Sequence, residues 1–119
     1  MNFELSDEQR MLQETLSRLL REQYPFETRQ KLLQSPQGFS REIWRRYAEL
    51  GILGVPFAPE LGGFGGSGIE LMLVAKEFGR ALALEPYLAT IVLGGTLLAT
   101  IDSQAARNLL EETISGQIL

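Results

Sequence analysis

The chain has 119 residues, of which 45% are hydrophobic and 22% charged, and its net charge is -4. This length predicts one domain, and the acidic excess disfavours nucleic acid or anionic membrane surfaces as partners, because both attract basic patches. There is no cysteine or histidine, which excludes a disulfide framework, a thiolate nucleophile, a Ser-His-Asp triad and nearly every structural zinc site. The sequence does not open with a charged and then apolar leader, so we expect a cytoplasmic protein.

Helix signals begin close to the N-terminus. Ser6 and Gln9 form a capping box, and leucines at helical spacing then continue as far as Pro25. A shorter, polar helix is expected over residues 26–34, where the turn-forming sequence SPQG follows.

A third helix is predicted from Ser40, which is a good N-cap residue. Trp44 and Tyr47 lie on its apolar stripe, and we interpret Trp44 as a core anchor without a ligand role. Gly51 is the expected left-handed terminator of this helix.

The glycine-rich stretch that follows has the spacing G-x-G-x-x-G at Gly63, Gly65 and Gly68. A dinucleotide fingerprint needs a buried strand before the glycines, and two nearby prolines, Pro56 and Pro59, are incompatible with a central parallel strand. We therefore predict a surface loop with left-handed turns, in which glycine allows close approach of the backbone to a neighbouring group.

Two helices of unusual composition are predicted next. Ser67 and Glu70 form a second capping box, opening a helix to about Leu84 that should be buried on nearly all sides. The stretch from Pro86 to Ile101 carries no charge but is shorter than the roughly 20 apolar residues a bilayer requires, so we expect a buried helix of a water-soluble domain.

A last helix should be capped by Asp102 or Ser103 and closed by Gly116. Its inward-facing residues are predicted to be Ala106, Leu109, Leu110 and Ile114. The chain is thus predicted to be all-α, an orthogonal or up-down bundle of five to six helices in one domain over residues 1–119. Two consecutive helices with little polar surface exceed what so small a domain easily buries, so part of that surface is expected to meet a partner.

The order of these signals resembles the N-terminal helical domain of the acyl-CoA dehydrogenase family. The matching segments are FELSDEQRMLQETLSRLL, then FSREIWRRYAELGILGVPFAPELGGFGGSGIELMLVAKEFGRALA, and finally LLATIDSQAARNLLEETISGQIL. The combination of A-E-L-G-I-L-G-x-P, E-x-G-G and E-F-G-R-A is specific in this order, although many relatives have an aromatic residue at Leu61.

The resemblance implies the N-terminal part of a larger three-domain flavoenzyme, present as a fragment or as part of a split arrangement. Such enzymes use FAD to desaturate acyl-CoA thioesters, and their catalytic glutamate and most FAD contacts lie in a central β-domain and a C-terminal helical domain. No catalytic, cofactor-binding or metal-binding residue is therefore expected in this chain. Expected partners are the missing domains, acyl-CoA and further subunits of a homo- or hetero-oligomer.

The resemblance also implies a wall of the acyl pocket at Pro86, Tyr87, Thr90 and Ile91. The alternative for Tyr87 and Thr90 is a core aromatic residue and a helix threonine bonded to its own backbone. Depth at such a wall would select acyl-chain length or bulk, because each buried methylene contributes about 0.8 kcal/mol.

Three other interpretations remain open on the sequence. Glu70, Glu77 and Glu85 form either a carboxylate cluster for acid-base chemistry or, as we favour, a helix cap and a solvated strip. The basic face of Arg41, Arg45 and Arg46 meets coenzyme phosphates or, as the negative net charge favours, keeps a helix soluble. A free-standing helical interaction module that lost its catalytic domains is the alternative function.

Overall fold

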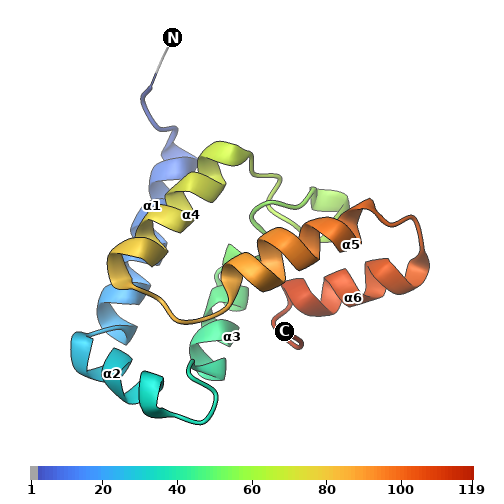
Figure 1. Cartoon of the computed structure of the whole chain (residues 1–119). Helices are drawn as coiled ribbons and strands as arrows, with labels where there is room; N and C mark the ends of the chain where they lie inside the picture. Colours follow the sequence, from blue (N-terminus) through green and yellow to red (C-terminus); the bar gives the residue numbers. More distant parts are fainter. Residues whose placement is uncertain (1–2) are drawn as a thin grey trace.

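The computed structural model describes residues 3–119, and every regular element in that range is a helix (Figure 1). This confirms the predicted all-α class. The α-helices are α1 (Asp7–Gln23), α2 (Phe26–Gln34), α3 (Arg41–Glu49), α4 (Gly68–Ala81), α5 (Thr96–Thr100) and α6 (Gln104–Ile114). Two short 3-10 helices, η1 (Ile52–Gly54) and η2 (Pro59–Leu61), and a π-helical segment, η3 (Leu88–Gly95), complete the fold. The molecule is flat, with extents of 43 × 41 × 19 Å.

Helices α1 and α4 lie side by side (Figure 1). A side-chain hydrogen bond joins their capping boxes. The Ser6 hydroxyl accepts from the Gln9 amide at 3.1 Å, and the Ser67 amide donates to the Glu70 carboxylate at 2.7 Å, as the sequence predicts. The Gln9 side chain also donates to Glu70 at 3.0 Å. Gln9, the third helical residue in the capping box of α1, therefore holds the start of α4 beside it.

The core lies where α1, α3, α4 and α6 meet η1 and the start of η3. Its fully buried side chains include Leu16, Trp44, Tyr47, Ile52, Leu53, Val55, Val74, Ile91 and Leu110. Ser40 caps α3 by accepting from the Ile43 amide at 3.1 Å, and Gly51 ends that helical turn at φ 78°. Both the predicted start and the predicted terminator of α3 are confirmed.

The glycine-rich segment is a loop between η2 and α4, as predicted. Gly65 has φ 77°, in the left-handed region, and its amide donates to the Phe57 carbonyl at 2.7 Å. A Cβ at Gly63 would overlap the same Phe57 backbone, and one at Gly66 would lie 2.6 Å from the Val55 carbonyl oxygen. Glycine is required here because the loop packs against its own chain.

Helix α4 ends at Ala81, three residues before the predicted end at Leu84. Leu82 adopts a left-handed conformation with φ 52°, which costs a residue with a side chain about 1–2 kcal/mol. The Ala83 amide bonds back to the Phe78 carbonyl at 3.0 Å and closes the turn. The sequence does not predict this ending, because leucine is not a usual residue for a left-handed helix terminus.

The predicted helix over residues 86–101 is present as one continuous helical path, formed by η3 followed by α5. The wide π-helical turns of η3 are not predicted by the sequence, and such turns are rare and often occur at functional sites. The Phe57 ring packs against Gly95, where a Cβ would overlap it. No helix within residues 3–119 is both long and apolar enough to cross a membrane.

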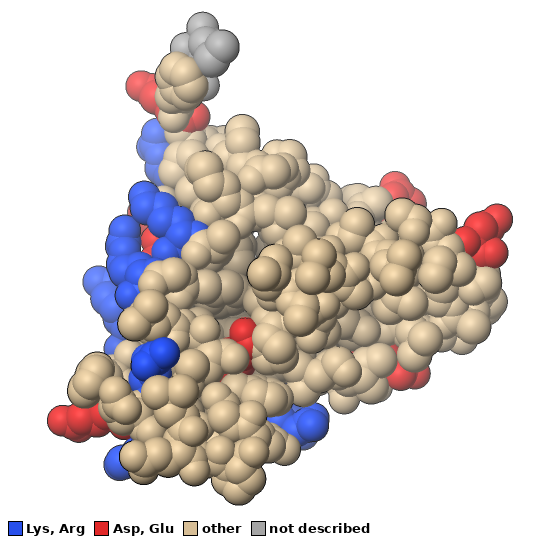
Figure 2. Space-filling model, in the orientation of Figure 1, with Lys and Arg blue, Asp and Glu red and all other residues tan. Residues whose placement is uncertain are grey.

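The expectation that α4 is buried on nearly all sides is wrong within this chain. Only Leu73, Val74 and Glu77 of α4 are buried, whereas Met72 is 56% exposed. The expectation of a buried helix over residues 86–101 is also wrong within this chain, because Leu88, Leu93 and Leu97 are 64–66% exposed. Figure 2 shows the resulting broad uncharged surface across the face that carries α4 and α5. The prediction of apolar surface in excess of what the domain buries is therefore confirmed.

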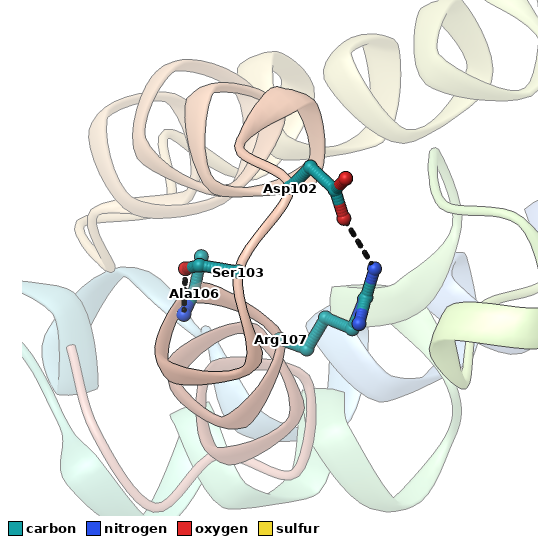
Figure 3. A network of polar contacts seen from close by, with 4 residues as sticks. All are labelled: Asp102, Ser103, Ala106 and Arg107. Atoms are coloured by element: carbon teal, nitrogen blue, oxygen red, sulfur yellow. Dashed lines mark hydrogen bonds and ion pairs between the residues drawn. The ribbon is translucent and has the colours of Figure 1, made fainter.

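The start of α6 resolves the alternative between two capping residues (Figure 3). Ser103 is the cap, since its hydroxyl accepts from the Ala106 amide at 3.1 Å, while Asp102 pairs with Arg107 at 2.6 Å. Ala106, Leu110 and Ile114 pack inward as predicted, but Leu109 is 45% exposed and that prediction is wrong. Thr113, which is not predicted to face inward, is buried together with Ala106 and Leu110.

Candidate functional site

The four residues predicted to form an acyl-pocket wall lie together at the start of η3, with different exposure. Tyr87 and Ile91 are buried in the core of this chain, and the Tyr87 hydroxyl donates to the Ile52 carbonyl at 2.9 Å. Pro86 and Thr90 are half-buried, and the Thr90 amide bonds to the Pro86 carbonyl at 3.0 Å. Within this chain, only Pro86 and Thr90 of the four have a substantial accessible surface.

A row of aromatic rings supports this segment from behind. The Tyr47 and Phe78 ring centroids lie 5.1 Å apart, and those of Phe78 and Tyr87 lie 5.0 Å apart at an interplanar angle of 63°. Edge-to-face pairs of this kind contribute about 0.5–1.5 kcal/mol beyond their buried area. The row ties the first turn of η3 to both α3 and α4.

The connection between α4 and η3 is held by hydrogen bonds from several other parts of the chain, including one from Arg29 on α2 to the Leu82 carbonyl at 2.8 Å. Glu85 accepts from the Tyr24 hydroxyl, from the Tyr47 hydroxyl at 3.0 Å and from the Ser40 amide at 3.0 Å. The Leu84 amide donates to the Tyr24 hydroxyl at 3.1 Å. A segment without regular secondary structure is therefore fixed through its side chains and backbone.

These contacts correct the prediction that the three glutamates are a cap and a solvated strip. Glu70 is the cap, but Glu77 and Glu85 are only 3% and 6% exposed. The Glu77 carboxylate accepts from the Gln13 side chain at 3.2 Å and lies 3.8 Å from the Arg80 guanidinium. Sequence reasoning misses this burial because the hydrogen-bond donors to these two carboxylates lie far away in the sequence.

The three buried tyrosines remain protonated hydrogen-bond donors. Burial raises the pKa of Tyr24, and the hydrogen bond to Glu85 raises it further. Burial and the charge of Glu85 raise the pKa of Tyr47, while burial alone raises the pKa of Tyr87. Their hydroxyls are thus suited to donating to Glu85 and to the Ile52 carbonyl at any physiological pH.

The basic face predicted on α3 is exposed, and of its three arginines Arg46 alone forms an ion pair within residues 3–119. Arg46 pairs with Glu49 at 2.6 Å, whereas Arg41 and Arg45 border a cavity of about 400 Å³ between α3 and the end of α6. Trp44, which is 1% exposed, forms another part of this wall, and its indole N–H has no acceptor among the described residues. The prediction of Trp44 as a core anchor is confirmed.

The hydrogen bonds of the glycine-rich loop support its interpretation as a loop and not as a dinucleotide fingerprint. Amides of the glycine-rich loop donate to carbonyls of the same chain, Gly66 to Val55 at 2.8 Å and Phe64 to Gly54 at 2.9 Å. They are therefore not free to bind a pyrophosphate. Within residues 3–119, no group of three or more acidic side chains gathers as metal ligands would.

The fold and this arrangement define the class of protein. The family model described as "Acyl-CoA dehydrogenase, N-terminal domain" matches residues 6–117. The chain belongs to this family, as its sequence motifs predict.

Curated relatives are longer dehydrogenases of the same class. The chain is 30% identical over 116 residues to acyl-CoA dehydrogenase IpdE2 of Mycobacterium tuberculosis, with 95% of this chain and 36% of the relative covered. It is 31% identical over 100 residues to the probable acyl-CoA dehydrogenase YngJ of Bacillus subtilis, with 82% and 26% covered. The chain thus spans about a third or less of the length of these relatives.

A solved structure with the same fold belongs to a complex of two proteins. A chain of the ChsE4-ChsE5 complex from Mycobacterium tuberculosis superimposes with a TM-score of 0.86 at 28% sequence identity. The match covers 98% of this chain and 32% of that chain.

Proposed function

We propose that this chain is the N-terminal domain of an FAD-dependent acyl-CoA dehydrogenase, which desaturates an acyl-CoA thioester between its α and β carbons. The observation that carries the proposal is the exposed apolar face of α4, η3 and α5, on a chain that matches the family from residue 6 to residue 117. Leucines two-thirds exposed in a monomer favour a further covering surface, because each fully buried leucine contributes about 1.5–3 kcal/mol.

In this proposal the flavin and the catalytic base belong to parts of the protein beyond the described residues. The flavin, when bound there, supplies the acceptor for the substrate hydride. The residues described here supply packing and exclusion of water, since the exposed face is apolar at Leu88, Leu93 and Leu97. Central β- and C-terminal helical domains, in the same or a second polypeptide, are the proposed partners, within a homo- or hetero-oligomer.

The proposed acyl-binding wall has a front and a rear. Pro86 and Thr90, which keep accessible surface, contact the acyl chain, while Tyr87 and Ile91 fill the layer behind them. The buried hydroxyl of Tyr87 already donates to Ile52, so this side chain supports the wall without requiring a substrate contact. An apolar channel at this position would discriminate acyl chains by their length or bulk.

The general proposal is tested by supplying the flavin-binding domains with this chain and measuring bound flavin and its bleaching by acyl-CoA. Yellow protein that bleaches with an acyl-CoA is the expected result. Assembled protein that binds no flavin would contradict the proposal and favour the free-standing interaction module. The cytoplasmic location stays a prediction, to be checked by cell fractionation.

The wall is tested by Thr90→Phe in the same assembled protein. We expect the preference to move toward shorter acyl chains, because a larger side chain removes volume for several methylene groups at about 0.8 kcal/mol each. Thr28→Phe is the matched control, since Thr28 is also half-buried but lies on α2, away from η3. An identical chain-length profile for wild type and Thr90→Phe would contradict the assignment.

A further inference from the structure

The joint between α4 and η3 contains a buried carboxylate that the proposed wall does not itself use. Glu85 is 6% exposed and directly precedes Pro86, the first residue of the wall. Its hydrogen-bond donors come from the end of α1 (Tyr24), the N-cap of α3 (Ser40) and the body of α3 (Tyr47). One side chain therefore connects the start of η3 to two other helices.

The Glu85 carboxylate is stabilised by hydrogen bonds from neutral donors, two tyrosine hydroxyls and a backbone amide. Within residues 3–119, neither Lys nor Arg forms an ion pair with this carboxylate. Burying a carboxylate without a cation is unfavourable, and an apolar side chain of similar size would fill the joint at a lower desolvation cost. Stability is therefore a weak reason for a carboxylate here, whereas directional hydrogen bonding is something an apolar residue does not provide.

The two oxygens of Glu85 have separate tasks. Oε1 accepts from both tyrosine hydroxyls, and Oε2 accepts from the Ser40 amide. A glutamine has only one acceptor oxygen, so its NH₂ group would face either the Ser40 N–H or the two hydroxyls. The arrangement thus specifies a carboxylate in one orientation.

A displacement of Glu85 would also displace Pro86, the adjacent residue at the front of the wall. Pro86 follows without an intervening residue, and its carbonyl accepts from the Thr90 amide at 3.0 Å. The rear of the wall has its own anchor in the Tyr87 hydroxyl, which bonds to Ile52 at 2.9 Å. The front has no comparable side-chain bond at Pro86 or Thr90 among the described contacts, so Glu85 is its nearest fixed point.

We propose that Glu85 is a positioning residue, which sets the place of Pro86 and Thr90 and thereby the acyl-chain selectivity of the assembled dehydrogenase. This inference rests on the proposed function. Glu85 touches neither substrate nor flavin in this scheme, and it acts only by holding the first turn of η3 against α1 and α3.

The test compares Glu85→Gln with Glu77→Gln in the assembled, flavin-loaded protein. Glu77 is a matched control, because it is also a buried carboxylate (3% exposed) but is bonded to Gln13 on α1 and not to the joint. The readout is the ratio of kcat/KM for butanoyl-CoA to that for dodecanoyl-CoA, with the melting temperature measured in parallel. A displaced wall is expected to change the ratio about tenfold in Glu85→Gln, with Glu77→Gln leaving it within about twofold.

Loss of thermal stability in both variants with an unchanged ratio in both would show that Glu85 is only structural and overturn the proposal. If Glu85→Gln does not fold, Tyr47→Phe removes one donor with little change in volume, and a smaller change of the ratio in the same direction is expected. An unchanged ratio in Tyr47→Phe would then overturn the proposal. Wild-type protein that binds no flavin or acyl-CoA would instead refute the proposed function, and the inference with it.

Discussion

Helix α1 and the helix formed by η3 and α5 are both rich in leucine, but α1 buries its leucines whereas the second helix exposes most of its own. In α1 the leucines at 12, 16, 19 and 20 are buried and the charged residues face water. In the second helix Ile91 is buried, while Leu88, Leu93 and Leu97 face outward. The sequence of an amphipathic helix thus predicts its orientation, whereas a helix that is apolar all round acquires one only from its neighbours.

The difference also separates two kinds of apolar surface. The leucines of α1 contribute to folding of this chain, since their area leaves water when α1 packs against α4. The outward leucines of η3 and α5 contribute little to that step, because about two-thirds of each stays exposed, and any larger contribution depends on a second surface. The same residue type therefore has different consequences in the two regions.

The largest test of this contrast is a pair of leucine truncations in the 119-residue chain. Leu16→Ala should lower the free energy of unfolding by about 3 kcal/mol, because Leu16 is 1% exposed and truncation leaves a cavity. Leu93→Ala should stay within about 0.5 kcal/mol, because Leu93 is 64% exposed. Urea unfolding measures both. Equal losses would mean that the outward leucines are already buried in solution.

A second pair compares a glycine of η3 with a glycine of α4, the helix that packs against α1. Gly95→Ala should destabilise the chain by about 1–3 kcal/mol, because the new methyl group overlaps the buried Phe57 ring. Gly79→Ala on α4 should instead stabilise it by about 0.4–1 kcal/mol, since nothing lies within 4 Å of its Cβ position and alanine favours a helix. Thermal melts of the two variants should shift in opposite directions. Two shifts of the same sign would contradict the packing of Phe57 on η3.

The smallest effect concerns the polar link between α1 and α4. The Ser67 hydroxyl, and then the Gln9 side chain, lower the pKa of Glu70 from 4.5 to about 2. Because the folded pKa is lowered, ionised Glu70 stabilises the fold above pH 4.5, and this contribution is lost as the pH falls from 4.5 to about 2. The stability difference between wild type and Glu70→Gln should narrow over that window in urea unfolding. A constant difference would show that the carboxylate does not act through its charge.

The parts of the fold that sequence reasoning predicts correctly are encoded within a few residues. The capping boxes at Ser6 and Ser67 are recognisable because each joins residues three apart. Gly51 is recognisable because a positive φ strongly favours glycine. The sequence does not decide between Asp102 and Ser103, because both are good caps and only the hydrogen bonds of the folded chain distinguish them.

The errors share a different cause. Helical spacing predicts that Leu109 faces inward, but Leu109 lies at the edge of the face that buries Ala106, Leu110 and Thr113, and its side chain stays 45% exposed. The charge of Glu77 and Glu85 predicts solvent exposure, although α1 and α3 provide donors that bury them. Local pattern gives the average behaviour of a residue type, and packing between distant elements decides the individual case.

The sequence alone determined the helical class, the positions of most helix starts and ends, and the excess of apolar surface, since these follow from local backbone hydrogen bonding and composition. The tertiary structure decided which side of η3 and α5 faces out, that Glu85 is buried at the joint, and that the glycine-rich loop packs on its own backbone. Each of these outcomes depends on groups brought together from distant parts of the chain. The contacts between these groups stabilise the chain only once the helices have packed together.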